Sequence, residues 1–283
     1  MRQMATGSHY KGTEILLATM HRKEEVIAPP FSELLGAQVE VSLIDTDQFG
    51  TFSGEVERKD RSDRVARKKC LTALDRSSLS CGLSSEGSFG PHPELPFSVC
   101  DHEILYFIDH KRNFELIEQL LTPQTNFSKQ SISSFSELEA FAEKTLFPSH
   151  ALILKKGAKM VKGIQNCDDL ERAFYELCLL DGSNYIEAET DMRTHHNPTR
   201  MKIIGQLAYR LAKRLSTACP AWALPGFGMV GQEPGLPCIE CGTATERVAF
   251  EIHKCAKCPH EEQLPRADGL QYAQPAECSY CNP

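Results

Sequence analysis

The spacing of apolar residues along the chain predicts short strands that alternate with helices as far as about residue 216. Short apolar runs bounded by polar or glycine-containing segments predict strands, and apolar residues that recur every three or four positions predict helices. Strands alternating with helices indicate an α/β domain with a mixed sheet and flanking helices. The expected strands cover residues 14–19, 38–44, 79–84, 104–108, 151–154 and 185–189. The expected helices cover residues 31–35, 62–74, 114–121, 135–145, 168–180 and 198–215.

Two of these helices have clear start signals. Ser134 followed by Glu137 has the spacing of a capping box, so a helix should begin directly after Ser134. Asn197 is a favourable N-cap and Pro198 a favourable first helical residue. The last helix should bury one apolar stripe along its length. That stripe consists of Met201, Ile204, Leu207, Ala208, Leu211 and Leu215.

The periodic pattern stops after residue 216 and gives way to a segment with three C-x-x-C pairs. The pairs are Cys238/Cys241, Cys255/Cys258 and Cys278/Cys281. Two such pairs can hold one tetrahedral zinc ion through four thiolates. Because an all-sulfur ligand set leaves no open position, we expect a structural zinc site. The predicted organisation is therefore an α/β catalytic or ligand-binding domain over residues 1–216 and a zinc-ribbon module over residues 217–283.

Composition and charge narrow the class of partner. The chain of 283 residues is 41% hydrophobic and 24% charged, and its formal net charge is −7. A negative net charge argues against general binding to nucleic acids or anionic membranes, because phosphate contacts need a positive surface. The sequence has neither a leading export signal nor an apolar run long enough to cross a membrane. We therefore expect a soluble, cytoplasmic protein.

Three polar segments between predicted elements carry the candidate chemistry. The first, residues 45–55, offers three carboxylates, Asp45, Asp47 and Glu55, together with three hydroxyls and two glycines. Such oxygen-rich loops can hold a hard divalent cation such as Mg²⁺. An ordinary turn with local hydrogen bonds explains the same composition equally well.

The second segment, residues 85–93, follows a predicted strand and is expected to be a loop. Strand ends are where α/β folds place their binding sites, and glycines there allow a ligand to approach the backbone. Glu86 is a candidate metal ligand or base, and His92 a candidate general acid or base. The alternative for His92 is a solvated turn residue between two prolines.

The third segment, residues 189–200, is a candidate anion site. Arg200 falls in the first turn of the last predicted helix, where a positive charge opposes the helix dipole. A bound anion held by free backbone N–H groups, Arg200, Arg193 and Asn197 would explain that placement. A surface arginine paired with Asp191 or Glu189 is the alternative. Lys23, after the first strand, is a further candidate for binding the same anion.

Several common catalytic signatures are missing from the sequence. It contains no G-x-S-x-G, no P-loop and no H-E-x-x-H, and no dinucleotide-binding fingerprint follows a predicted strand. These absences argue against serine hydrolases, P-loop nucleotidases, zinc proteases of that type and Rossmann oxidoreductases.

Five motifs together resemble a bacterial family known only as a domain of unknown function. They are ATMHRKE at 18–24, DTDQFGTFSGE at 45–55, SEGSFGPHP at 85–93, FPSHALIL at 147–154 and ETDMR with NPTRM at 189–201. The resemblance implies four C-x-x-C pairs in the tail, but here Cys219 is followed by Trp222 where the second cysteine of the first pair would stand. One complete four-cysteine site is then expected, and a second site with Cys219 would need His253, His260 or water. Cys219 as a buried free thiol is the alternative.

A second likeness is to the inosine-triphosphate pyrophosphatase type of fold. Residues 18–23, 55–69 and 85–87 follow its order of a lysine-bearing loop, an acidic loop leading into a basic helix, and an acid-glycine strand end, although the lysine spacing is one residue short. The leading hypothesis is a metal-dependent hydrolase of a nucleotide or other phosphorylated small molecule. In it Glu86 with Asp45, Asp47 or Glu55 binds Mg²⁺, and Lys23, Arg193 and Arg200 bind the anion. The competing hypothesis is a non-catalytic sensor of a small anion whose ribbon contacts a protein partner.

Overall fold

The computed structural model describes residues 9–50, 60–180 and 185–283. The chain divides into two compact units. One contains residues 14–32 and 37–210, and the other contains residues 33–36, residues 211–283 and the described part of the N-terminal segment. No helix in the described part of the chain is both long enough and apolar enough to cross a membrane.

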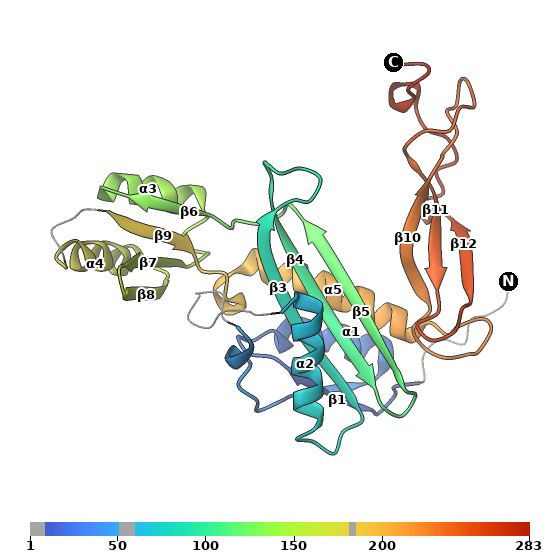
Figure 1. The fold of residues 1–283 in the computed structure, drawn as a ribbon, viewed down its shortest axis with the longest axis horizontal. Coiled ribbons are helices and arrows are strands. Elements are labelled where there is room, and N and C mark those ends of the chain that lie inside the picture. Colours follow the sequence, from blue (N-terminus) through green and yellow to red (C-terminus); the bar gives the residue numbers. More distant parts are fainter. Residues whose placement is uncertain (1–8, 51–59, 181–184) are drawn as a thin grey trace. The chain divides into compact units, whose positions relative to one another are not determined.

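The larger unit is built on a five-stranded mixed sheet with the order β2-β1-β3-β4-β5 (Figure 1). β1 is parallel to both β2 and β3, whereas β3, β4 and β5 pair in antiparallel fashion. The predicted α/β class with a mixed sheet is therefore confirmed. The strands are β1 (Glu14–Ala18), β2 (Gln38–Val41), β3 (Cys81–Pro91), β4 (Val99–Asp109) and β5 (Phe114–Thr122).

Helices cover both faces of this sheet. α2 (Ser62–Leu74), which has the predicted bounds, packs on β1, β3 and β4. Figure 1 shows α1 (Glu24–Leu35) and α5 (Pro198–Ser216) behind the sheet, on the face opposite α2. α1 begins well before the predicted start at residue 31, even though Pro29 and Pro30 lie inside it. The apolar face of α1, formed by Ile27, Phe31 and Leu35, is buried, and this burial outweighs the cost of the two prolines.

A second, four-stranded sheet in the same unit has the order β6-β9-β7-β8 and is entirely antiparallel. α3 (Phe135–Lys144) and α4 (Cys167–Cys178) pack on it through one apolar core that includes Leu138, Phe141 and Phe174. Ser134 accepts a hydrogen bond from the backbone N–H of Glu137, as the capping box predicts. The strands are β6 (Lys129–Ile132), β7 (Leu152–Lys156), β8 (Lys159–Ile164) and β9 (Ile186–Thr190).

Two local predictions in this unit are wrong. Residues 114–121, expected to be helical, form β5, because they pair with β4 along the whole segment. Residues 85–93, expected to be a loop, continue β3 as far as Pro91, with a partner on β4 at every position. The second error matters for function, because a strand aims successive side chains at opposite faces of the sheet.

The cysteine-rich part forms a three-stranded antiparallel sheet with the order β10-β11-β12. Turns carrying the cysteines surround it, so this part fits a zinc-ribbon-like module, as predicted. Its strands are β10 (Gly228–Pro234), β11 (Val248–Lys254) and β12 (Glu261–Pro265). Short 3-10 helices complete the chain at η1 (Asp47–Phe49), η2 (Thr194–His196) and η3 (Pro275–Glu277).

Candidate functional site

The candidate site lies where β3 extends beyond the end of β1. The pairing of the two parallel strands ends at Ala18 and Ser84, and from Ser85 onward β3 keeps only β4 as a partner. The carboxyl ends of parallel strands are the usual binding region of α/β folds. The polar residues from Ser85 onward therefore lie in the region of the sheet where a ligand site is expected.

The α2 side of this region holds a buried ion pair. Ser84 donates its hydroxyl to the carbonyl of Ala66 on α2, which places the even-numbered residues of β3 on that face. Two positions farther along, the Oε2 atom of Glu86 lies 2.5 Å from the Nζ atom of Lys69, also on α2. Both side chains are buried. Glu86 thus lies on a strand and is paired with Lys69, whereas the sequence predicted that it lies in an open loop.

The opposite face holds a second ion pair, Arg200 with Glu103. Arg200 Nε lies 2.5 Å from Glu103 Oε1, and Nη1 donates to the carbonyl of Met192 at 2.5 Å. Arg200 is 1% exposed and its guanidinium lies 5.3 Å from the centre of the Phe89 ring. A Cβ atom on Gly87 would collide with both Arg200 and Glu103, so this position requires glycine. Arg200 lies in the first turn of α5, as predicted, and is buried there against Glu103.

Lys23 lies close to both ion pairs. It follows two consecutive residues in the left-handed conformation, His21 and Arg22, and its Nζ donates to the Ser85 hydroxyl at 3.1 Å. The lysine is only 7% exposed. Burial, followed by the charge of Arg200, lowers the pKa of Lys23 to about 7. The charges of Glu103, Lys69 and Glu86 also act on this pKa, so both ion pairs are close to the lysine.

The turn that presents Lys23 is held by the segment before α5. The hydroxyl of Thr194 donates to the carbonyl of His21 at 2.7 Å. Left-handed backbone is uncommon in residues other than glycine and persists only where surrounding contacts impose it. Two such residues in succession, tied down by a residue 173 positions away, indicate that the placement of Lys23 is built into the fold.

Two carboxylates on β4 were not predicted from the sequence. Together with Lys23, Lys69, Glu86 and Arg200 they form the group of charged side chains that we call the cluster. Asp101 and Glu103 lie on the same face as Ser85 and are 1% and 0% exposed. Among the described residues, Asp101 Oδ1 and Glu103 Oε2 have no hydrogen-bond partner. In β4, residues 101, 103, 105, 107 and 109 are buried, and on the other face residues 102 and 106 are partly exposed. Extending the predicted strand at residues 104–108 toward its N-terminus would have revealed both carboxylates.

Replacing Asp101 by Asn is expected to reduce the dependence of stability on pH. Burial, followed by the charge of Glu103, raises the pKa of Asp101 from 3.8 to about 8. The folded form then binds more protons than the unfolded form between these values, so the contribution of Asp101 is full below about pH 4 and is lost as pH rises through 8. Urea unfolding at pH 5 and pH 8 gives the free energy of unfolding at each pH. Its decrease from pH 5 to pH 8 should be smaller in Asp101→Asn than in the wild-type protein by about 2 kcal/mol or more. Equal losses in both proteins would contradict the shift.

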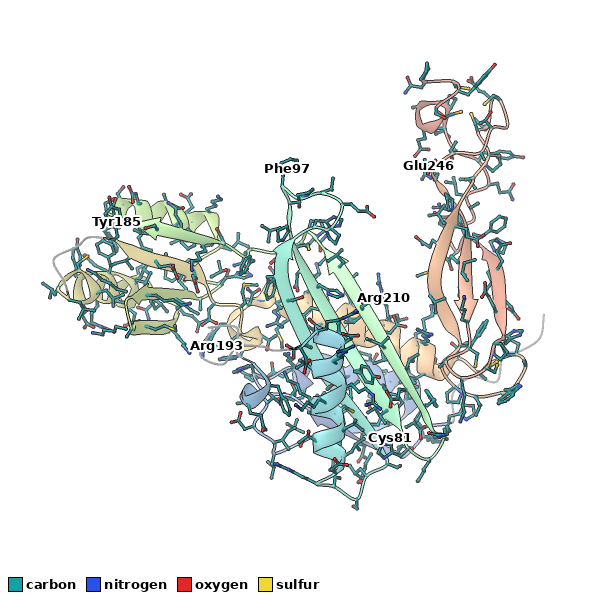
Figure 2. The ribbon with its side chains drawn as sticks, viewed as in Figure 1. Cys81, Phe97, Tyr185, Arg193, Arg210 and Glu246 are labelled. Atoms are coloured by element: carbon teal, nitrogen blue, oxygen red, sulfur yellow. The ribbon has the colours of Figure 1, made fainter. Side chains whose placement is uncertain are left out.

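The remaining predicted residues lie around this cluster without entering it. Arg193 makes a two-pronged salt bridge to Asp191, with Nη2 2.6 Å from Oδ2 and Nε 3.0 Å from Oδ1. Figure 2 labels Arg193 in the segment that leads from β9 to α5. Asn197 Oδ1 accepts from the backbone N–H of Arg200 at 3.0 Å, so Asn197 is the predicted N-cap. Arg193 therefore shows the alternative arrangement, in which an arginine pairs with Asp191.

His92 and the first polar segment contribute less to the geometry. His92 Nδ1 accepts from the backbone N–H groups of Glu94 and Leu95, both at 3.2 Å, and so shapes the β3–β4 turn that carries Phe97 at its tip (Figure 2). Asp45 is exposed. The side chain of Asp47 and all of Glu55 lie outside the described residues. Of the three polar segments, residues 85–93 and 189–200 meet where Arg200 lies against Gly87 and Phe89.

A cavity of about 310 Å³ lies next to the cluster, within the larger unit. Phe89, which lies against Arg200, stacks on Phe127 with ring centres 5.3 Å apart. Lys129 and Lys155 line the cavity and both pair with Glu189. The cavity also includes Asp191 and Arg193. Aromatic rings beside paired charges are a common lining of small-molecule sites.

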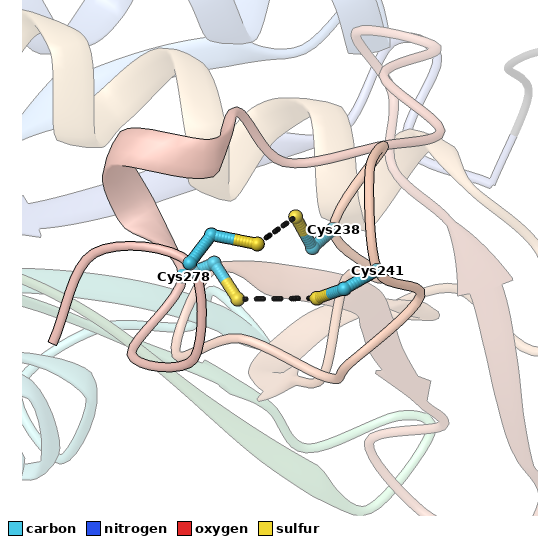
Figure 3. Close-up of side chains that lie close together, drawn as sticks. Cys238, Cys241 and Cys278 are labelled. Carbon is cyan, nitrogen blue, oxygen red and sulfur yellow. Dashed lines mark hydrogen bonds between the residues drawn. The ribbon is translucent and has the colours of Figure 1, made fainter.

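The cysteines form two groups that could hold a metal ion. Cys238, Cys241, Cys278 and Cys281 bring four sulfurs within 4.8 Å of one another. The Cys238–Cys281 and Cys241–Cys278 sulfur distances are 3.9 and 3.6 Å, drawn as dashed lines in Figure 3. Four ligands at the zinc–sulfur distance of about 2.3 Å would be separated by about 3.8 Å, so the group fits a tetrahedral ion. The second group consists of Cys219, Cys255 and Cys258.

Comparison with known proteins identifies the family. No curated protein matches the chain. Residues 69–283 match the family model described as a domain of unknown function, DUF6671, which agrees with the family-level resemblance seen in the sequence. The matched region contains Lys69, Glu86, Glu103 and Arg200 as well as the cysteine groups. Because the match covers most of the chain, this protein belongs to the DUF6671 family.

Proposed function

We propose that the α/β part is a metal-dependent hydrolase that acts on a nucleotide or another phosphorylated small molecule. The observation that carries this proposal is Lys23, which is buried beside Ser85 and whose pKa is lowered to about 7 by burial and then by the charge of Arg200. Strongly shifted pKa values of buried groups with specific charged neighbours are typical of functional sites. The position of the lysine at the carboxyl end of β1 supports the same assignment.

The charge of a substrate would complete this cluster. A bound phosphate group brings negative charge next to Lys23 and stabilises its ammonium form. Arg193 lies at the edge of the neighbouring cavity and is the second proposed contact for the anion. A nucleotide is the favoured substrate class, because the cavity of about 310 Å³ offers the aromatic ring of Phe127 for stacking against a base. Arg200 and Asn197 position the site by holding Glu103 and the start of α5.

The carboxylates of the cluster suit a divalent cation such as Mg²⁺. Asp101 and Glu103 each have a buried oxygen without a hydrogen-bond partner among the described residues, and hard cations prefer such oxygens. Glu86, with Asp45, Asp47 or Glu55 from the first polar segment, supplies further candidate ligands. When bound, the cation would neutralise phosphate oxygens and activate a water molecule. The protein would contribute the carboxylates, the cationic Lys23 and a largely water-free setting.

The hydrolase proposal is tested with a panel of nucleotides and phosphate esters, with and without Mg²⁺. Turnover that requires Mg²⁺ is expected for at least one nucleotide, and Glu86→Gln should lower kcat by about a hundredfold or more, as is usual for a lost acid-base or ligand carboxylate. Glu94→Gln, in the exposed β3–β4 turn, is the matched control and should keep full activity. Equal activity of the Glu86→Gln and wild-type proteins would refute the assigned site.

The affinity for a nucleotide is expected to depend on pH through Lys23. Without a ligand, Lys23 loses its proton near pH 7. Above that pH, an anion that needs the ammonium form of Lys23 can bind only if the protein also takes up a proton. Calorimetric titration with a nucleoside triphosphate should show affinity falling about tenfold per pH unit between pH 7.5 and 9. Lys23→Arg should abolish this slope, and Lys159→Arg, at an exposed position on β8, should retain it. A slope unchanged by Lys23→Arg would rule out Lys23 as the group responsible.

A non-catalytic sensor is the second candidate, and the surface of the ribbon favours it. Large apolar side chains of the cysteine-rich part are exposed, among them Trp222, Phe250 and Tyr280, and such side chains are common in contacts with protein partners. In this case the same panel would yield thermal stabilisation by a ligand without product formation.

For the four-cysteine centre we propose zinc, bound in a closed structural site. An all-thiolate tetrahedral ligand set is typical of structural zinc. We also propose that residues 217–283 form a module whose folding depends on this metal, separate from the α/β domain over residues 1–216.

A further inference from the structure

The turn at Cys219 has the backbone of a metal-binding knuckle. In the knuckle at Cys238, the Cys238 N–H donates to the carbonyl of Thr243 at 2.9 Å and the Gly242 N–H donates to the carbonyl of Cys238 at 2.9 Å. At Cys219 the same two hydrogen bonds recur at the same sequence separations. The Cys219 N–H donates to the carbonyl of Leu224 at 2.7 Å, and the Ala223 N–H donates to the carbonyl of Cys219 at 2.8 Å. The two turns therefore have the same hydrogen-bond pattern.

The conformation of residue five of each turn strengthens this equivalence. Gly242 has a φ of 74° and Ala223 a φ of 55°. The left-handed region favours glycine, and an alanine enters it only where the surrounding structure demands that turn. The Cys219 turn thus keeps the knuckle shape even though its sequence makes that shape unfavourable.

The two turns differ at the position of the second ligand. The fourth residue of the first knuckle is Cys241, one of the four clustered cysteines, whereas the fourth residue of the Cys219 turn is Trp222. Trp222 is 61% exposed. Indole nitrogen in tryptophan is a donor only and cannot replace a thiolate. This knuckle presents one sulfur where its counterpart presents two.

The remaining sulfurs are arranged for metal binding. Cys219 and Cys258 sulfurs lie 3.6 Å apart, and all three sulfurs of Cys219, Cys255 and Cys258 lie within 4.8 Å of one another. The backbone N–H groups of Lys257 and Cys258 both point at the Cys255 sulfur, at 3.4 Å. Such N–H···S contacts stabilise a thiolate. Phe227 packs against the group and shields one side of it.

The two histidines expected as alternative fourth ligands are engaged elsewhere. His253 Nε2 lies 3.2 Å from Glu251 Oε2, and His260 Nε2 lies 2.9 Å from Glu262 Oε1. Both rings lie beside Phe227, with centroid distances of 5.9 and 5.7 Å. Among the described residues, the metal-ligating atoms gathered here come from the three cysteines alone.

We propose that Cys219, Cys255 and Cys258 bind a second zinc ion whose fourth coordination position is open and holds an exchangeable ligand from solution. Water takes this position in the isolated protein, and soft or nitrogen donors such as thiols and imidazole displace it. Zinc with three protein ligands and one exchangeable position is the arrangement that permits ligand exchange, whereas four thiolates close the site. This inference does not depend on the hydrolase proposal.

Metal content tests the site itself. Native mass spectrometry of the full chain, reconstituted with zinc under reducing conditions, should find two zinc ions per chain, and Cys219→Ser should retain one. His260→Ala is the matched control and should retain two. One zinc ion in the wild-type protein, together with rapid alkylation of Cys219, would overturn the proposal.

Cobalt substitution tests the open position. In the Co²⁺-loaded wild-type protein, imidazole should shift the visible absorption of one of the two ions. Trp222→Cys should abolish that shift, because a fourth thiolate closes the site. For the same reason it should slow the release of the metal ion from the three-cysteine site to a chelator at least tenfold. Spectra insensitive to imidazole, with release kinetics unchanged by Trp222→Cys, would show that the fourth position is already closed and would overturn the proposal.

Discussion

Removing the metal from the four-cysteine centre is expected to unfold the cysteine-rich part and to leave the five-stranded sheet folded. The sheet β10-β11-β12 has a small apolar core, with Leu236, Ala249 and Ala273 as the buried residues of one of its clusters. Metal binding contributes about 10–16 kcal/mol in zinc-finger peptides, which exceeds what so small a core can supply. The larger unit has its own extensive core and needs no such contribution.

Hydrogen exchange before and after chelation measures this effect. Protection should be lost throughout β10, β11 and β12 and should persist in β3 and β4. Cys278→Ser should reproduce the loss in the presence of zinc, because it removes one ligand of the centre. Cys167→Ser, at an exposed cysteine at the start of α4, is the matched control and should behave as wild type. Retained protection in β11 after complete metal removal would contradict a metal-dependent fold.

Replacing Arg200 by Met is expected to destabilise the larger unit by about 3–5 kcal/mol. Arg200 and Glu103 are both almost entirely buried, so removing the guanidinium leaves a carboxylate in the interior without its cation. The carbonyl of Met192 also loses a donor. Breaking a buried pair on one side costs far more than breaking an exposed pair, which is usually below about 1 kcal/mol.

A double-mutant cycle separates the ion pair from packing. Arg200→Met combined with Glu103→Gln should recover at least about half of the loss, because the second change removes the isolated charge. Arg210→Met, on the exposed side of the same helix, is the control and should change the free energy of unfolding by less than about 0.5 kcal/mol. Urea unfolding of the wild-type protein, the two single variants, the double variant and the Arg210→Met control gives these values. Additive effects of the two changes would show that Arg200 acts through packing and not through Glu103.

Helices with strong local signals were predicted closely. α2 has the predicted bounds, and α5 begins at Pro198 behind the predicted cap, Asn197. The apolar periodicity of both helices is a local property of the sequence, and in α5 the cap residue agrees with it. α1 was predicted too short because local propensity argues against a helix through Pro29 and Pro30, whereas tertiary burial of its apolar face favours one.

Strand assignments failed where pairing decides the outcome. The β5 sequence, FELIEQLLT, is rich in good helix formers, yet it pairs with β4 over its whole length. Residues 85–91 contain the glycines and serines of a loop, yet each of them lies opposite a residue of β4 in the antiparallel ladder. A strand is stabilised by its neighbours, and a neighbour distant in sequence leaves no local signal.

The sequence by itself determined the α/β class and showed that the cysteines of the tail could hold a metal ion, because C-x-x-C spacing and apolar periodicity are local properties of the chain. Only the tertiary structure decided which cysteines share a centre, since Cys238 meets Cys281 and Cys219 meets Cys258. It likewise decided that Lys23, Lys69 and the β4 carboxylates surround the candidate site. Arg200 and Glu103 are 97 residues apart, and their contact follows from strand register and helix packing, which no local pattern encodes.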